Sequence, residues 1–141
     1  MNTKDSLLFL LSILIAADLN PLAVLLERPI HPFLSKPFEF GAIALTEEIL
    51  KWGLSLALYR FGAPAAVPIV VGIGFGGWEM LSFVHNKGAL VISRFGALSF
   101  HIFTGAVLWW ALKKKQPLWI GAALVVNILL HWWWNLQVIL K

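Results

Sequence analysis

Long apolar runs separated by short polar or proline-rich breaks organise the chain from end to end. Five such runs cover residues 6–26, 38–60, 64–85, 94–112 and 117–140. A helix of about 20 residues spans the roughly 30 Å hydrocarbon layer of a bilayer, and each run has about that length. The pattern therefore predicts an all-α integral membrane protein, a compact bundle of about five transmembrane helices that forms a single domain over residues 1–141.

The breaks between the runs hold residues that end helices. Residues 27–37 contain three prolines and are expected to form a loop, and residues 86–93 are expected to form a shorter polar loop. Asp18, Asn20 and Pro21 interrupt the first run, so that segment is either a bent span or a span followed by a turn at the membrane interface. The neighbours of Asp18, Asn20 and Pro21, suggest a helix end at this point.

Composition agrees with the membrane assignment. Hydrophobic residues make up 60% of the chain and charged residues 13%, whereas soluble domains are about half apolar and a quarter charged. The basic residues stand mostly at the ends of the runs, where they anchor helices and set orientation rather than bind nucleic acid. The compact cluster of residues 113–115, three lysines, favours a cell-membrane protein with its N-terminus inside. The sequence does not indicate an oligomeric state.

The absence of cysteine excludes a disulfide, a thiolate nucleophile and a cysteine metal site. The chain also has no His-Glu-x-x-His zinc motif, no Gly-x-Ser-x-Gly elbow and no phosphate-binding loop. A serine mechanism is not expected either, because no hydroxyl residue has an obvious neighbouring base.

Several polar side chains stand inside runs that are otherwise fit only for lipid. They are Glu47, Glu48, Lys51, Glu79, His101, His131 and Asn135. Each charge near a bilayer centre costs about 2.5–3.5 kcal/mol on insertion scales, so the glutamates and the lysine, if ionised and unpaired, would cost on the order of 10 kcal/mol. A small membrane protein tolerates this only if the groups meet in a protected interior, which indicates an intramembrane active site.

The second run places its two carboxyl groups next to a single ammonium group. On a helix, Glu47 and Lys51 are neighbours at i,i+4, and Glu48 and Lys51 at i,i+3. One lysine can therefore hold one carboxylate ionised and leave the other free, which is how a catalytic site separates two acids. The alternative is an ion pair that only holds helices together.

The remaining candidates are single residues or pairs. Glu79 follows a glycine-rich stretch suited to close helix packing, and it either has a partner across a helix interface or is merely hydrogen-bonded. His101 alone would more often be a satisfied core residue, but His131 lies in another run. His131 and Asn135 share one helix face at i,i+4. The tryptophans at 132–134 are expected to serve packing or an interfacial belt.

Taken in chain order, these motifs resemble the PrsW family of intramembrane proteases. The matching residues are Glu47-Glu48-x-x-Lys51, Phe75-x-x-x-Glu79, Arg94 with His101 and Gly105, and His131-x-x-x-Asn135. That family belongs to a superfamily with the CAAX prenyl proteases, the bacteriocin-processing membrane proteins and the scaffold subunit of gamma-secretase. The lysine spacing is closer to PrsW than to the CAAX proteases, and Ala97 replaces the phenylalanine frequent at that offset.

The resemblance implies roles for the matching residues. Glu47 would be the general base that activates water, assisted by His101, and Glu48 with Lys51 would brace the site. His131 and Asn135 would donate hydrogen bonds to the oxyanion of the tetrahedral intermediate. The resemblance also leaves a metalloprotease open.

A metal-dependent site would use zinc, and its candidate ligands are Glu47, Glu79, His101 and His131. The metal-free reading, with no cofactor, is favoured because no short-spaced ligand pair anchors a metal.

Three functions compete at this point. The favoured one is an intramembrane endopeptidase that hydrolyses a peptide bond of a membrane-anchored or membrane-associated protein or peptide. The second is a non-catalytic scaffold or immunity protein that keeps the polar cluster for assembly, although a scaffold does not need the whole set. The third is a small transporter with a proton relay, which predicts an internal repeat that the sequence lacks.

Overall fold

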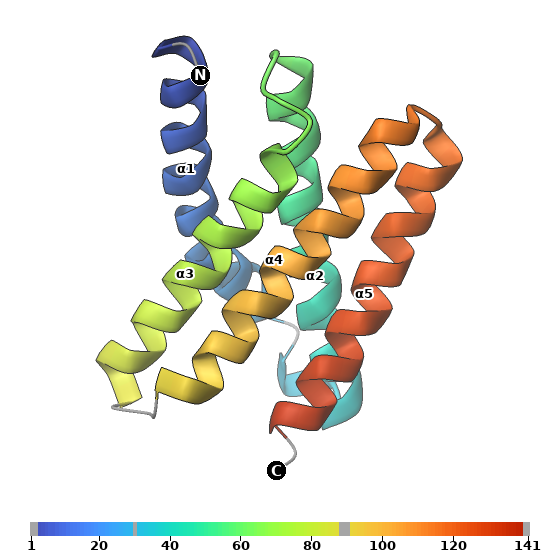
Figure 1. The fold of residues 1–141 in the computed structure, drawn as a ribbon. Helices are drawn as coiled ribbons and strands as arrows, with labels where there is room; N and C mark the ends of the chain where they lie inside the picture. The colour runs from blue at the N-terminus through green and yellow to red at the C-terminus, as the bar shows by residue number, and fades with distance from the viewer. Residues whose placement is uncertain (1–2, 30, 88–90, 140–141) are drawn as a thin grey trace.

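The computed structural model describes the backbone of residues 3–29, 31–87 and 91–139, and the side chains of residues 6–29, 32–82 and 95–137. Over these residues the chain is all-helical, as expected (Figure 1). The elements are α1 (Thr3–Glu27), the short 3-10 helix η1 (His31–Phe33), α2 (Lys36–Arg60), α3 (Val67–Lys87), α4 (Val91–Lys114) and α5 (Pro117–Ile139).

The helix bounds follow the apolar runs closely, with two differences. The loop expected over 27–37 shrinks to a short connection, because α2 already begins at Lys36 with a proline in its first turn, where the missing N–H costs nothing. The polar loop expected over 86–93 is shorter as well, since α3 runs to Lys87 and α4 begins at Val91.

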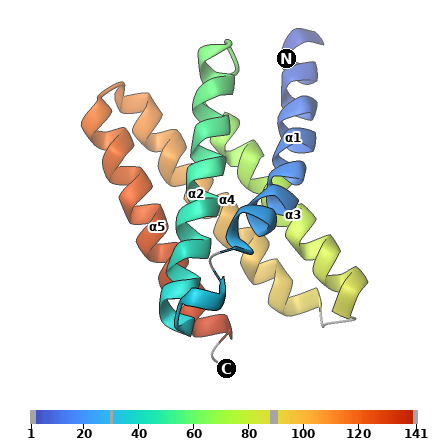
Figure 2. The same cartoon turned by 180° about the vertical axis from the view of Figure 1, so that it is seen from behind.

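Helix α1 decides between the two alternatives for its C-terminal half, because it is one continuous helix without a turn after Pro21. The helix continues through Pro21 to Glu27, so Asp18 lies within it and not near its end. One face of α1 is buried at Ser12, Ala16, Ala23 and Glu27. The spacings of four, seven and four residues define a single helical stripe, and burial of this stripe against the bundle outweighs the local effect of the proline. Figure 2 shows the last turns of α1 lying across the bundle at about its mid-height.

Glycines set the distance between helices at the centre of the bundle, where α3 packs against both α1 and α4. A Cβ atom at Gly72 of α3 would overlap the backbone carbonyl of His101, and one at Gly105 of α4 would overlap that of Pro68. On the other side of α3, a Cβ at Gly74 would come within 2.5 Å of the Ile13 carbonyl oxygen. The helices therefore touch backbone to backbone, as small-residue interfaces in membranes do.

Three of the helices are long and apolar enough to cross a membrane by themselves, over Ser6–Glu27, Phe95–Lys114 and Pro117–Gln137. The described part of α3 contributes a shorter apolar helix, Val67–Ser82. Helix α2 carries Glu47, Glu48 and Lys51 in its middle, which lowers its hydropathy. Leucines on the outer face of α1 are strongly exposed, Leu14 and Leu25 by more than 60%. Such a face suits contact with lipid rather than water.

Candidate functional site

Four helices bring their polar side chains to one place in the bundle. Helix α2 supplies Glu47, Glu48 and Lys51, α3 supplies Glu79, α4 supplies His101 and α5 supplies His131. Their side chains form a continuous series of contacts in the order Glu79, His101, Lys51, Glu48, His131 and Glu47. The sequence analysis expected these groups to meet inside the bundle, and the fold shows which side chain contacts which.

Lys51 and Glu48 form the buried centre of this series. The Lys51 ammonium donates to Oε1 of Glu48 at 2.5 Å, and both side chains are nearly inaccessible. The same Glu48 oxygen lies 2.8 Å from Nδ1 of His131. Lys51 therefore takes Glu48 as its partner, rather than Glu47. A carboxylate with these two partners is held ionised, which fits a bracing role.

His101 lies between Lys51 and Glu79, and its partners define its tautomer. Lys51 Nζ is 2.8 Å from His101 Nδ1, and Glu79 Oε2 is 2.9 Å from His101 Nε2. An ammonium group can only donate hydrogen bonds, so Nδ1 accepts and the ring proton stands on Nε2, where it is donated to Glu79. His101 is thus a neutral ring with both nitrogens engaged.

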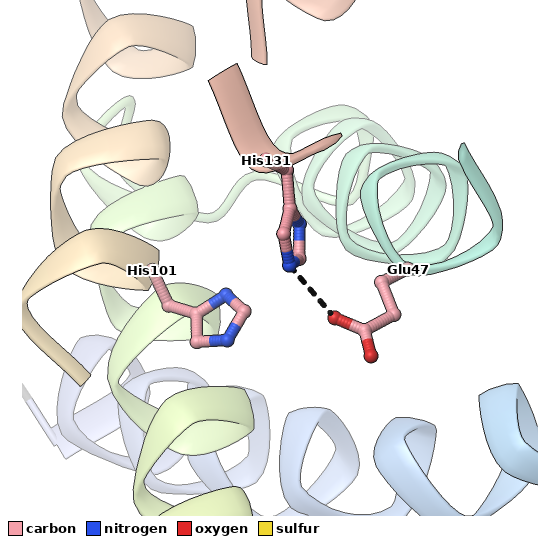
Figure 3. A group of neighbouring side chains, drawn as sticks. All are labelled: Glu47, His101 and His131. Carbon is pink, nitrogen blue, oxygen red and sulfur yellow. Dashed lines mark ion pairs between the residues drawn. The ribbon is translucent and has the colours of Figure 1, made fainter. Parts of the chain in front are cut away.

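Glu47 and His131 face each other with a different geometry (Figure 3). Oε2 of Glu47 lies 3.5 Å from Nε2 of His131, and the ring of His101 lies beside them on α4. Because Glu48 accepts the Nδ1 proton of His131, Nε2 of the neutral ring is an acceptor. Two hydrogen-bond acceptors that face one another repel. The contact is favourable only if they share a proton or if a third molecule donates a hydrogen bond to each. Glu47 is also the carboxyl that Lys51 leaves free.

Aromatic rings fix the two imidazoles. The rings of His101 and His131 meet at 5.2 Å between centroids, and Phe75 stands edge-on to His101 at 5.1 Å. Phe100 lies 5.3 Å from His131 and stacks on Trp134. Apolar walls of this kind lower the local dielectric and strengthen each polar contact in the site.

The tryptophan cluster of α5 serves packing where the structure describes a contact. Nε1 of Trp132 donates to the Pro37 carbonyl at 2.8 Å and thereby docks α5 on the start of α2. Trp134 packs on Phe100 and close to Gly96. Only Trp133 is strongly exposed.

Three further residues that the sequence suggested have different outcomes in the structure. Asn135 is buried on the same face of α5 as His131, one turn away. The side chain of Arg94 lies outside the described residues. Gly105, the last member of the His101 motif, sits at the α3–α4 contact rather than among the polar groups.

A small polar cavity next to the site contains residues that the sequence did not suggest. It has a volume of about 10 Å³, and its walls include Lys51, His101, Trp52 and Asn127. Asn127 donates from Nδ2 to the Thr104 carbonyl at 2.9 Å. Its Oδ1 and the Trp52 Nε1 are buried without a hydrogen-bond partner among the described residues. One water molecule fits such a space and can satisfy both atoms. The sequence could have indicated Asn127, because it is a polar residue one helical turn before His131 on α5.

Glu27 is a second residue that the sequence did not indicate. It was expected in a loop, yet it is 5% exposed at the inner end of α1, and its carboxyl interacts electrostatically with that of Glu47. The spacing of Ser12, Ala16 and Ala23 before it could have predicted its inward position.

One set of residues is suited in kind to a metal ion. Ligand atoms of Glu47, His101 and His131 all lie within 4.8 Å of one another. Three nitrogen and oxygen ligands with an open fourth position are the donor set of catalytic zinc. His131 also has the carboxylate partner on its second nitrogen that metal-bound histidines usually have. His101 fits less well, because Lys51 and Glu79 already engage both of its nitrogens.

Comparison of the chain with protein-family models, with curated proteins and with solved structures finds no match.

Proposed function

We propose that the chain is an intramembrane endopeptidase that hydrolyses a peptide bond of a membrane-associated protein or peptide. The observation that carries the proposal is the grouping of Glu47, His131 and His101, in which Glu47 Oε2 lies 3.5 Å from His131 Nε2. A water molecule there can give one O–H to each acceptor, which orients its oxygen and raises its nucleophilicity. The resemblance of the motifs to PrsW proteases supports the same assignment.

The reaction needs only the residues of this site. The water oxygen attacks the peptide carbonyl carbon while Glu47 accepts a proton, so that a C–O bond forms and the carbonyl π electrons become an oxyanion. The C–N bond then breaks, and Glu47 returns the proton to the leaving nitrogen. The products are a carboxylic acid and an amine.

The other residues stabilise charge and geometry. The water proton that Glu47 accepts would be shared with Nε2 of His131, 3.5 Å away, so that this ring and Asn135 would donate to the oxyanion. Each donor is worth about 2.7–4 kcal/mol when well placed. Glu48 would stabilise the positive charge that the His131 ring then carries. Lys51 and Glu79 hold His101 from both sides, so that its ring borders the water without rotating.

The proposal places all five helices across a membrane. Backbone groups of a spanning segment must be satisfied within the protein, and helices do this. Helix α2 would cross because its ionisable groups point to partners in the bundle instead of to lipid. The substrate would then reach the site from the membrane.

Hydrolysis in ¹⁸O-labelled water tests the proposal. The purified full chain is reconstituted in liposomes with a mixture of synthetic peptides, each with an apolar 20-residue core, and the products are analysed by mass spectrometry. We expect one ¹⁸O in each new C-terminal carboxyl group. Glu47→Gln should reduce the rate about 10²–10⁴-fold, the usual contribution of a general base.

Glu39→Gln is the matched control, since it makes the same change on the same helix at a carboxyl paired with Lys36. It should cut at the wild-type rate. Equal rates for wild type and Glu47→Gln would remove Glu47 as the base. No cleavage by a folded wild-type protein would favour the scaffold, and proton flux through the same liposomes would favour the transporter.

A zinc-dependent peptidase is the second candidate, and the Glu47–His101–His131 set favours it. These residues would hold the ion, which would supply Lewis acidity to the water and the carbonyl. Elemental analysis of protein purified without a metal-affinity step distinguishes the two. About one zinc per chain, lost in both His101→Ala and His131→Ala, would establish the metal site, and cleavage that survives chelation would contradict it.

A further inference from the structure

The inner end of α1 carries an acidic side chain that the proposed mechanism does not use. Glu27 is the last residue of α1 and continues its buried stripe of Ser12, Ala16 and Ala23. The last turns of α1 lie across the bundle at about its mid-height (Figure 2), so this helix ends within the bundle and not at its rim. The interaction between the Glu27 and Glu47 carboxyls agrees with that position.

The carboxyl of Glu27 is buried without full satisfaction. Among the described residues, its Oε1 has no hydrogen-bond partner, although the side chain is 95% enclosed by the protein. Burying a polar atom in this way costs stability, and a buried charge costs more unless it is paired. A smaller apolar residue would continue the stripe of α1 without this cost. The presence of a buried carboxyl group at this position is therefore better explained by a bound ligand than by helix packing.

The charges around the site point to the sign of that ligand. Four carboxyl groups gather there, from Glu27, Glu47, Glu48 and Glu79, against one ammonium group among the described residues. That ammonium, on Lys51, is already committed to Glu48 and His101. A cation beside Glu27 would give its Oε1 the partner that the described residues do not supply. The metal-type set of Glu47, His101 and His131 does not include Glu27, so a metal ion there would leave Glu27 unpaired.

We propose that Glu27 binds a positively charged group of the substrate, a lysine or arginine side chain or a free amino group, near the bond that is cut. This inference rests on the proposed peptidase function, and it makes Glu27 a specificity-determining residue.

A binding measurement tests this separately from catalysis. Glu47→Gln protein in liposomes is mixed with dansyl-labelled peptides that share an apolar core and differ at one flanking position, lysine or the uncharged norleucine. Energy transfer from the protein's tryptophans to dansyl reports binding. We expect the lysine peptide to bind about 10-fold more tightly, and addition of Glu27→Gln to abolish the difference.

Two variants complete the design. Asp18→Asn removes an exposed carboxyl from the same helix and should keep the preference. Glu27→Asp keeps the charge and should retain part of it, which a purely structural role would not require. Lysine and norleucine peptides that bind equally, or a preference that survives Glu27→Gln, would overturn the inference.

The two proposals fail in different ways. A lysine preference that depends on Glu27, in a protein whose wild type cuts none of the peptides, would keep the cation site and overturn the peptidase. Cleavage that depends on Glu47 without a Glu27-dependent preference would do the reverse. A lysine preference abolished by added zinc but kept in chelator would assign the cation site to the metal set instead and overturn the role of Glu27.

Discussion

Lys51 is the residue that links the Glu79–His101 contact to the Glu48–His131 contact. Its ammonium serves both Glu48 and His101, and it lies 5.2 Å from the centre of the Phe75 ring. Removal of one partner of a buried ion pair leaves the other charge without compensation, which costs about 3–5 kcal/mol. We therefore expect Lys51→Met to unfold at a much lower temperature in detergent and to lose activity.

The double variant Lys51→Met, Glu48→Gln should recover much of that loss, because it removes the stranded charge together with the lysine. Lys36→Met is the control, since Lys36 pairs with Glu39 at 3.2 Å but is itself 71% exposed. The Glu39 side chain is only 11% exposed, but water and ions reach the Lys36 end of the pair, so Lys36→Met should cost much less stability than Lys51→Met. A Lys51→Met protein as stable as wild type would show that the buried pair carries no net stabilisation.

For individual residues, the sequence predicts which side chains form the polar site, but it does not predict which of them contact one another. The spacing in α2 allowed Lys51 to serve either Glu47 or Glu48. The choice of Glu48 depends on His131, which comes from α5 and adds a second donor to the same oxygen. Glu79 and His101 are 22 residues apart, so their contact follows from helix packing that no local pattern contains.

Among the helices, α3 and α4 have the contact that positions His101. Gly72 lies against the His101 carbonyl and Gly105 against the Pro68 carbonyl. Each glycine therefore leaves room for the backbone of the other helix. A methyl group at Gly72 would separate the helices and displace His101 from Lys51. We expect Gly72→Ala to cost about 1–3 kcal/mol, as overpacking does, and to reduce cleavage as well.

Gly77 offers a control on the same helix, because a Cβ atom there would meet nothing within 4 Å. Gly77→Ala should be neutral or gain up to about 1 kcal/mol from helix propensity. Thermal unfolding of the two variants in one detergent compares them directly. Equal stability of both variants would show that α3 and α4 tolerate a wider separation.

The apolar runs predicted the helices well because each is long and bounded by prolines or charges. The predicted end of the first helix was wrong because packing against the bundle outweighed the local helix-breaking residues. Asp18 and Pro21 indicated a helix end, yet the small residues on either side of them bury a stripe that holds α1 helical to Glu27. The inward position of Glu27 was missed for the same reason.

Membrane topology is the property of the whole molecule that the proposal depends on most. Among the residues that the structure describes, three helices are long and apolar enough to cross a membrane by themselves. If all five cross with the N-terminus inside, the α2–α3 and α4–α5 connections lie inside and the α1–α2 connection lies outside. If α2 and α3 instead form a hairpin that enters and leaves on one side, the α2–α3 connection does not lie inside.

A chain without cysteine allows a direct test by single-cysteine labelling. Ser35, Phe61 and Gln116 are exposed and stand in the three connections concerned. In intact cells, we expect a membrane-impermeant maleimide to label Ser35→Cys, and to reach Phe61→Cys and Gln116→Cys only after the membrane is opened. Labelling of Phe61→Cys from outside would contradict five crossings. It would also alter how Glu47 is reached, because α2 would then bring its carboxyl groups to the site from the outer water and not through the bilayer.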